Sequence, residues 1–347
     1  MKKKIHIGIL ECPGASRYGP MTQRLLDRAE HNLKMRGMNQ KRQSSDTTVE
    51  NDIYIPQSVE YIIFEAAKGD LPLTSRDEHT CSGDYSESRS CDAYVITGSR
   101  HGAYEELEWI EKLIEWIKVT REDKKKIVGI CFGHQVIAKA FGASVILNPA
   151  GFELGVYQLD LEKVMLPFML QEWWQRHVSL FAQENGVHIR ARPLNFVVCL
   201  YSFICIVYPL QDSQEYKQLC RNRSQADDSG IALYYVHNDI VVPGTLPTTK
   251  VSLSNGETVL LRSLGGTELS PVNALMDDEG YILTFQGHPE FDLEAVNDAV
   301  TSLSARGVLP RRLPSGQSLS DCRKLLDDNE TNGDEIGEAL YEFLTSC

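Results

Sequence analysis

The stretch Gly129-Ile130-Cys131-Phe132-Gly133-His134-Gln135 decides the fold. The apolar run Ile127–Ile130 predicts a buried strand at its start, and the residues that follow as far as Phe141 predict a helix. This Gly-x-Cys-x-Gly arrangement is typical of a nucleophile elbow with cysteine in place of serine. Its glycines permit a sharp turn without side-chain clashes, and the start of a helix favours the thiolate form of Cys131. The sequence therefore predicts a reactive thiol above a sheet, with a buried structural cysteine as the alternative.

Strand-like and helix-like segments alternate around this elbow. The expected strands are Ile5–Leu10, Val59–Phe64, Ala93–Thr97 and Ile127–Ile130, and the expected helices are Met21–Met35, Leu107–Ile117 and Gly133–Phe141. Further elements are expected at Glu153–Leu161, Ile231–Val236, Val259–Leu264 and Tyr281–Phe285 (strands) and at Leu293–Leu303 and Glu335–Leu344 (helices). Such alternation indicates an α/β fold, and we predict a flavodoxin-like, doubly wound, mostly parallel sheet with flanking helices.

The pattern breaks once, between residues 162 and 228. We therefore expect one domain over residues 1–310, interrupted by an irregular insertion at 162–228, with a flexible segment and a C-terminal helix in 311–347. The insertion holds Trp173-Trp174 and the apolar run Phe196–Tyr208. A lid or a partner-docking element is one interpretation. An insertion tolerated at the surface, or a translated intron in the gene model, is the interpretation we favour.

Composition excludes several functions. The 347 residues carry a net charge of −13, which repels phosphate backbones, so no nucleic-acid partner is expected. The apolar run Phe196–Tyr208 is shorter than the ~20 residues of a spanning helix, which argues against a membrane protein. Nine cysteines without a Cys-x-x-Cys pair argue against both a zinc site and a disulfide framework. We expect a cytoplasmic protein with no metal and no organic cofactor.

A second motif supplies a partner for the thiol. In Gly287-His288-Pro289-Glu290, the spacing of two along extended chain puts His288 and Glu290 on the same side. A carboxylate there can hold one imidazole nitrogen and direct the other at Cys131. In α/β-hydrolases the acid precedes the histidine, and in DJ-1-like proteins a histidine directly follows the elbow cysteine, where this chain has Phe132. Neither order matches, and the pattern predicts a Cys-His-Glu triad.

Together, the motifs GICFGHQ, GHPEFD and TGSRHGAYE (starting at Gly129, Gly287 and Thr97) resemble those of the class I glutamine amidotransferases. Within that family the chain is similar to free-standing fungal and bacterial members often labelled GMP synthase-like. The resemblance implies Cys131 as nucleophile, His288 as base and Glu290 as the residue that orients it. It also implies backbone N–H donors to an oxyanion at Gly98 and Phe132, and contact between Gln135 and the substrate.

One further segment resembles a substrate-binding loop. Tyr235-Val236-His237-Asn238-Asp239 is similar to the family's His-Arg-Asp loop, with Asn238 in place of arginine. The resemblance implies that His237 lies near the α-amino and α-carboxylate groups of the substrate.

The implied activity is hydrolysis of the γ-amide of glutamine, or of a γ-glutamyl bond in a small peptide, through a thioester on Cys131. No Gly-x-x-x-x-Gly-Lys-[Ser/Thr] loop and no Ser-Gly-Gly-x-Asp-Ser motif occurs, so the chain shows no acceptor-activating domain. Ammonia would be released or passed to a separate synthase chain. The alternative is a catalytically silent binding or scaffold protein that keeps the amidotransferase fold.

Overall fold

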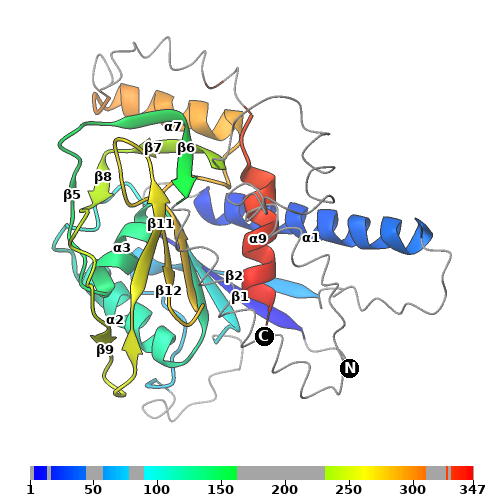
Figure 1. Ribbon diagram of the computed structural model, residues 1–347, viewed down its shortest axis with the longest axis horizontal. Coiled ribbons are helices and arrows are strands. Elements are labelled where there is room, and N and C mark those ends of the chain that lie inside the picture. The colour runs from blue at the N-terminus through cyan, green and yellow to red at the C-terminus, as the bar shows by residue number, and fades with distance from the viewer. Residues whose placement is uncertain are drawn as a thin grey trace, which may run out of the picture.

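A nine-stranded sheet with helices on both faces forms the centre of the molecule (Figure 1). The computed structural model describes residues 4–13, 17–43, 58–77, 90–161, 231–309, 326 and 330–346. The expected insertion at 162–228 lies outside these residues. The sheet order is β2-β1-β3-β4-β13-β12-β11-β6-β7.

The first five strands of this order are parallel and carry the elbow. They are β1 (Ile5–Glu11), β2 (Val59–Glu65), β3 (Ala93–Ile96), β4 (Lys126–Ile130) and β13 (Ile282–Phe285). β4 lies between β3 and β13, with Ile96 opposite Gly129 and Phe285 opposite Ile130. The carboxyl ends of these three strands therefore meet at one edge, where ligands bind in open α/β sheets.

The other strands extend the sheet in antiparallel fashion. These are β6 (Glu153–Leu161), β7 (Ile231–His237), β11 (Leu261–Gly266) and β12 (Ala274–Asp277). Two small two-stranded sheets are formed by β5 (Val145–Leu147) with β8 (Asp239–Val241), and by β9 (Val251–Ser252) with β10 (Thr258–Val259).

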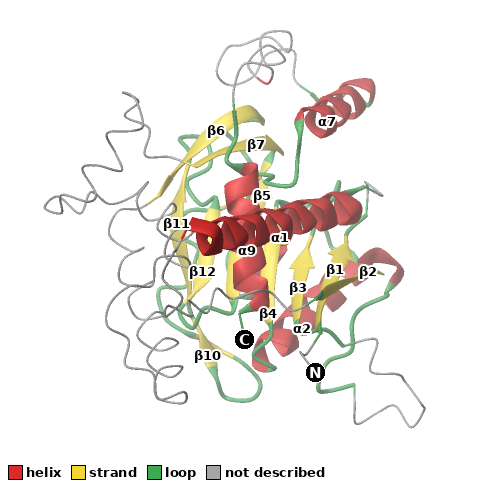
Figure 2. Cartoon of the chain, turned by 90° about the vertical axis from the view of Figure 1, so that its right-hand side faces the viewer, coloured by secondary structure: helices red, strands yellow, loops and turns green. Residues whose placement is uncertain are grey.

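Helices cover both faces of the parallel strands (Figure 2). The helices are α1 (Tyr18–Gln43), α2 (Glu108–Glu122), α3 (Phe132–Ala140), α7 (Leu293–Ala305), α9 (Gly333–Thr345) and the 3₁₀ turn η1 (Ala66–Lys68). Strand residues alternate between the two cores, because successive side chains point to opposite faces. In β3, Tyr94 packs with α2 and α3, whereas Val95 packs with α1 and α9. Burial on both faces explains why these strands are continuously apolar.

The predicted fold class is confirmed, and several elements differ in detail from those expected. Helix α1 continues to Gln43, beyond the end that we expected at Met35. The expected strand Val259–Leu264 is broken at Leu260, so its two parts pair in different sheets. Strand β12 was not expected, because its four residues are too few to show a period.

The C-terminal helix is present as α9 and packs into the same core as the sheet. Its buried residues Ile336 and Leu340 belong to one apolar cluster with Leu25 of α1 and Val128 of β4. The domain boundaries remain a prediction. Among the described helices, none is long and apolar enough to cross a membrane.

The elbow requires a close approach between α3 and β3. A Cβ atom at Gly133 would lie 2.2 Å from the backbone oxygen of Ile96. We expect Gly133→Ala to lower the free energy of unfolding by about 3 kcal/mol, because backbone must shift to admit the methyl group. The measurement is urea unfolding of the purified variant. The control is Gly19→Ala in α1, where a Cβ would lie 3.4 Å from its nearest neighbour, an ordinary contact. Equal stability of the two variants would contradict this account.

Strands β6 and β7 are adjacent where the chain leaves the described residues. They pair in antiparallel fashion, with Leu159 opposite Ile231. We therefore expect that joining Asp160 to Ser229 through a short Gly-Ser linker preserves the fold and the expected hydrolysis of glutamine, since a short connection can join adjacent antiparallel strands. The checks are the unfolding midpoint and glutamine hydrolysis. If the variant folds but no longer forms a thioester, residues 162–228 belong to the active site.

Candidate active site

Cys131 occupies a strained turn between β4 and α3. Its backbone has φ 54° and ψ −105°, in a region that non-glycine residues rarely adopt. The amide of Cys131 donates to the Phe285 oxygen at 2.8 Å, and its oxygen accepts from the Gln135 amide at 3.1 Å. These bonds hold the turn between β13 and the first turn of α3. The predicted elbow is therefore present in the backbone.

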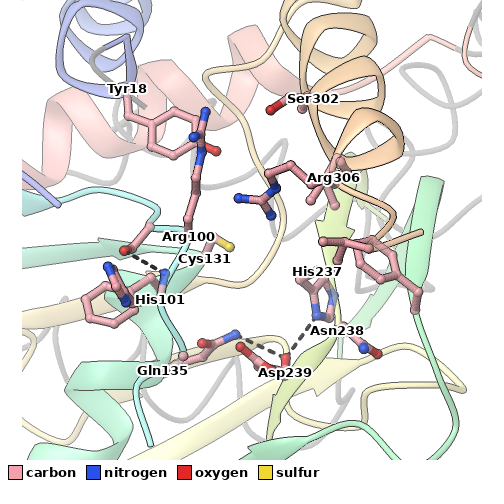
Figure 3. A pocket seen from close by; sticks show the side chains of 18 of the residues that line it. Tyr18, Arg100, His101, Cys131, Gln135, His237, Asn238, Asp239, Ser302 and Arg306 are labelled. Carbon is pink, nitrogen blue, oxygen red and sulfur yellow. Dashed lines mark hydrogen bonds between the residues drawn. The ribbon is translucent and has the colours of Figure 1, made fainter. Parts of the chain in front are cut away.

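A pocket of about 750 Å³ opens over Cys131 (Figure 3). Its walls come from the start of α1, the loop after β3, the elbow, the β7–β8 turn and α7. Of the site residues expected from the sequence, Cys131, Phe132, Gln135 and His237 line it. The Cys131 side chain is nearly buried, with an exposed fraction of 7%.

His288 and Glu290 lie together beside the elbow, both buried. The Nδ1 atom of His288 lies 2.7 Å from Oε1 of Glu290. Burial disfavours the imidazolium, but the charges of Glu290 and Cys131, with hydrogen bonds to both, raise the pKa of His288 to about 10. The structure thus brings together the three residues that two distant motifs predicted, with His288 between a carboxylate and the thiol.

Several contacts fix the His288 ring. Its backbone amide donates to the Tyr234 oxygen of β7 at 2.8 Å. Phe291 stacks on the imidazole with ring centroids 4.0 Å apart and an interplanar angle of 14°. The Tyr18 ring lies beside both of these rings, with its centroid 6.0 Å from that of the imidazole and 5.8 Å from that of Phe291. A Cβ at Gly98 would lie 3.3 Å from Cε1 of His288, so glycine keeps this position open.

The two expected oxyanion donors, the N–H groups of Phe132 and Gly98, belong to residues next to the elbow and to the end of the neighbouring strand. Phe132 is the first residue of α3, where helix N–H groups have no partner within the helix. Gly98 follows β3, beside the carboxyl end of β4. Within the described part of the chain, neither N–H donates to another protein group. Both residues lie at the strand ends that the sequence predicted for them.

Gln135 and His237 meet at the β7–β8 turn. The Gln135 amide nitrogen donates to the Asp239 oxygen at 3.0 Å and to Oε1 of Gln286 at 2.9 Å. His237 places Nδ1 3.0 Å from the Asp239 oxygen and Nε2 2.8 Å from Oε2 of Glu153, with both side chains buried. The imidazole of His237 therefore holds the turn against β6. Substrate contact by Gln135 and His237 remains a prediction.

Acidic groups gather beside this turn, and we call Tyr104, Glu105 and Asp239 the acidic end of the pocket. Burial raises the pKa of Asp239 to about 6, opposed by the charge of His237 and by a hydrogen bond with Tyr104. At neutral pH most Asp239 carboxyls are therefore ionised. An ionised carboxylate here would attract the ammonium group of an amino acid.

Three residues that contact His288 or His237 were not expected from the sequence. Tyr18 and Glu153 stand in no motif, and only the fold brings them to His288 and His237. Phe291 lies inside the GHPEFD motif, so its position could have signalled a role. In the described residues no cluster of three or more His, Cys, Asp or Glu side chains could hold a metal ion.

Comparison with known proteins defines the class. A family model described as glutamine amidotransferase class-I matches residues 71–305, more than half of the chain. The chain therefore belongs to the class I glutamine amidotransferase family.

Individual relatives match shorter segments. A Saccharomyces cerevisiae protein whose name places it among the glutamine amidotransferases is 39% identical over 114 residues, 32% of this chain and 42% of that protein. Gamma-glutamyl peptidase 4 of Arabidopsis thaliana is 39% identical over 84 residues, 23% of this chain and 34% of that protein. The chain thus spans less than half the length of either relative.

A solved structure supports the fold alone. A glutamine amidotransferase from Methylobacillus flagellatus superposes with a TM-score of 0.52 at 15% identity, over 99% of this chain and 94% of that one. The likeness covers both the parallel and the antiparallel parts of the sheet.

The three described cysteines differ in their surroundings, which predicts their order of reactivity. Burial raises the pKa of the Cys12 thiol, and it raises the pKa of Cys91 to about 12. Of these three described cysteines, Cys131 alone lines the pocket, and it lies beside His288, whose pKa is raised to about 10. We expect brief iodoacetamide treatment near neutral pH to label Cys131 before Cys12 and Cys91. Peptide mapping by mass spectrometry is the readout, and earlier labelling of Cys91 would contradict the prediction.

Proposed function

We propose that this protein hydrolyses the γ-amide of glutamine, or a γ-glutamyl bond in a small peptide, through a γ-glutamyl thioester on Cys131. One observation carries the proposal. Cys131, in a strained turn, lies beside His288, whose pKa is raised and whose Nδ1 atom contacts the Glu290 carboxylate. Membership of the class I glutamine amidotransferases and likeness to a gamma-glutamyl peptidase support it.

The proposed reaction begins from an ion pair between the thiolate form of Cys131 and the protonated imidazole of His288. Because the pKa of His288 is raised to about 10, its imidazolium form is present at neutral pH. The thiolate attacks the γ-carbonyl carbon, an S–C bond forms, and the carbonyl oxygen becomes an oxyanion. The N–H groups of Phe132 and Gly98 are the proposed donors to this oxyanion.

Collapse of the tetrahedral intermediate breaks the C–N bond. His288 transfers its Nε2 proton to the departing nitrogen, which leaves as ammonia or as an amine. Water then attacks the thioester and gives a proton to His288, and glutamate departs as the S–C bond breaks. Throughout the cycle Glu290 holds Nδ1 and thereby keeps Nε2 directed at the reacting atoms.

The substrate side of the proposal follows from the acidic end of the pocket. Asp239 would attract the α-ammonium of the glutamyl unit, and Gln135 and His237 would hold the turn that carries Asp239. No acceptor-activating motif stands in the sequence. We propose that ammonia is released or passed to a separate synthase chain, in the cytoplasm.

The test is an assay of the purified full-length protein with glutamine and with γ-glutamyl dipeptides. Ammonia or amine and glutamate are quantified together, and acid-quenched enzyme is examined by mass spectrometry for a γ-glutamyl adduct on Cys131. Turnover with the adduct supports the proposal. Absence of both turnover and adduct with every γ-glutamyl compound would instead identify a binding or scaffold protein.

A further inference from the structure

Two arginines line the pocket on the side of Cys131 away from the acidic end. Arg100 lies in the loop after β3, and Arg306 is the C-terminal cap of α7. In Figure 3 both side chains extend toward the space above the Cys131 sulfur, whereas Gln135 and Asp239 lie on its other side. We call Tyr18, Arg100 and Arg306 the arginine end of the pocket.

In the part of the chain that the structure describes, no carboxylate pairs with either guanidinium group. Among the described residues, neither Arg100 nor Arg306 forms an ion pair or a side-chain hydrogen bond. Arg17, at the same rim, differs because its Nη1 atom lies 2.7 Å from Oδ2 of Asp298. Two unneutralised cations that face one pocket create a positive potential in it, which attracts an anion. A guanidinium presents paired donors that match the two oxygens of a carboxylate.

Helix α7 holds Arg306 in place. Its buried residues Val296 and Val300 pack with Phe291 and Tyr234, next to the His288 ring. The Arg17–Asp298 ion pair ties the outer side of α7 to the start of α1. Arg306 therefore extends from a packed helix rather than from a free chain end.

The two ends of the pocket differ in the charged groups that shift the pKa values of their residues. Burial and the charge of Cys131 raise the pKa of the Tyr18 hydroxyl, and Arg100 and Arg306 act to lower it. The charged groups that act on Asp239 are instead His237 and Glu105. The thiol thus stands between a cationic region and an anionic one.

This division orients a substrate. If the γ-carbonyl lies at the Cys131 sulfur and the α-ammonium lies at the acidic end, the glutamyl unit fills the pocket between Cys131 and the acidic end. The group beyond the scissile C–N bond then extends toward the arginine end. The volume of about 750 Å³ lies within the roughly 300–1,000 Å³ of sites that hold drug-sized ligands, which leaves room beyond one amino acid.

We propose that the substrate is a γ-glutamyl peptide whose leaving group carries a carboxylate, bound jointly by Arg100 and Arg306. The inference rests on the proposed function and narrows its substrate class. Hydrolysis then breaks the γ-glutamyl C–N bond, water supplies the oxygen of the new γ-carboxylate, and the leaving group departs as a free amino acid or peptide. Glutamine lacks this carboxylate and is the poorer substrate.

The experiment compares three substrates that share the glutamyl unit. They are γ-glutamyl-alanine, γ-glutamyl-alaninamide, which lacks the leaving-group carboxylate, and glutamine. We expect the full-length protein to show a kcat/KM for γ-glutamyl-alanine roughly tenfold to hundredfold above that for the alaninamide, the range of a charge-assisted hydrogen bond. Equal values for the two peptides would overturn the proposal.

Substitution of the two arginines tests whether they cause the preference for a leaving-group carboxylate. Arg100→Gln and Arg306→Gln should each lower kcat/KM for γ-glutamyl-alanine about tenfold and leave the alaninamide and glutamine values within about twofold. The matched control is Arg24→Gln, an exposed arginine of α1 outside the pocket, which should change none of them.

The glutamyl unit itself carries a second carboxylate, the α-carboxylate, which the two arginines could bind instead. If the arginines bind that group, both variants will lose activity equally on all three substrates, and the proposal is wrong. Acyl-enzyme on Cys131 after incubation with glutamine tests the proposed function separately. If the adduct forms but kcat/KM is equal for the two peptides, only this inference is wrong. If no substrate forms an adduct, the proposed function itself is wrong.

Discussion

Alanine at position 131 is expected to abolish turnover, with kcat reduced by about 10⁵-fold or more, because alanine lacks the sulfur that forms the proposed thioester. A nucleophile and its base act as a unit, so loss of the sulfur removes the whole covalent route. The measurement is glutamate release from glutamine and from γ-glutamyl-alanine, together with the mass of the acid-quenched enzyme. Both the product and the adduct should disappear.

The matched control for this change is Cys91→Ala. Cys91 is as buried as a core residue, and burial raises its pKa to about 12, so its thiol is neutral at pH 7. We expect a lower urea midpoint and an unchanged kcat. Retention of an adduct in Cys131→Ala, or loss of turnover in Cys91→Ala, would place the nucleophile elsewhere.

Glutamine at position 290 is expected to lower kcat by about 10³–10⁴-fold, as loss of the carboxylate from a comparable triad does. Glu290 holds Nδ1 of His288 at 2.7 Å and contributes to the raised pKa of that histidine. Without the charge, the imidazolium that we propose as the proton donor to the leaving nitrogen is less stable. The nitrogen then departs as a poorer leaving group.

The same change should move the pH profile in a defined direction. The acid form of His288 is present below its pKa of about 10 and is lost as pH rises through that value. The wild-type rate should therefore fall on the alkaline side near pH 10. In Glu290→Gln the fall should occur at lower pH, since the pKa of His288 moves back toward about 6.5.

Stability should follow the same linkage. The folded-state pKa of His288 lies above its unfolded value of about 6.5, so its stabilisation is complete below that pH. It is lost as pH rises toward about 10. Urea unfolding between pH 6 and pH 10 measures this loss, which should be smaller in Glu290→Gln.

Another buried carboxyl provides the control for Glu290→Gln. Burial, and next the charge of Glu338, raise the pKa of Glu342 in α9 to about 8, so this carboxyl is largely neutral at pH 7. Glu342→Gln should leave kcat and the alkaline limb unchanged. An alkaline limb that stays at the same pH in Glu290→Gln would show that His288 is not the titrating group.

Local chemistry explains how much of the elbow could be predicted from the sequence. The glycines of GICFGHQ are required because Gly133 approaches the Ile96 oxygen too closely for any Cβ. The continuous apolar runs identify the parallel strands, because both faces of those strands are buried. The spacing of His288 and Glu290 also allowed their contact to be predicted, because the two residues are only two positions apart in the chain. Nδ1 of His288 lies 2.7 Å from Oε1 of Glu290.

The rest of the pocket depends on contacts between segments that are distant in sequence. Tyr18, Arg100 and Arg306 reach one cavity from three different elements. Arg100 stands in the motif TGSRHGAYE, but Tyr18 and Arg306 stand in no motif. The same holds for Glu153, which pairs with His237 across the antiparallel β6 and β7. Residue spacing constrains only what lies within a few positions along the chain. The sequence by itself therefore determined the turn and the chemistry that it presents, and the tertiary structure decided which charges surround that chemistry, because burial and the packing of distant elements set those positions.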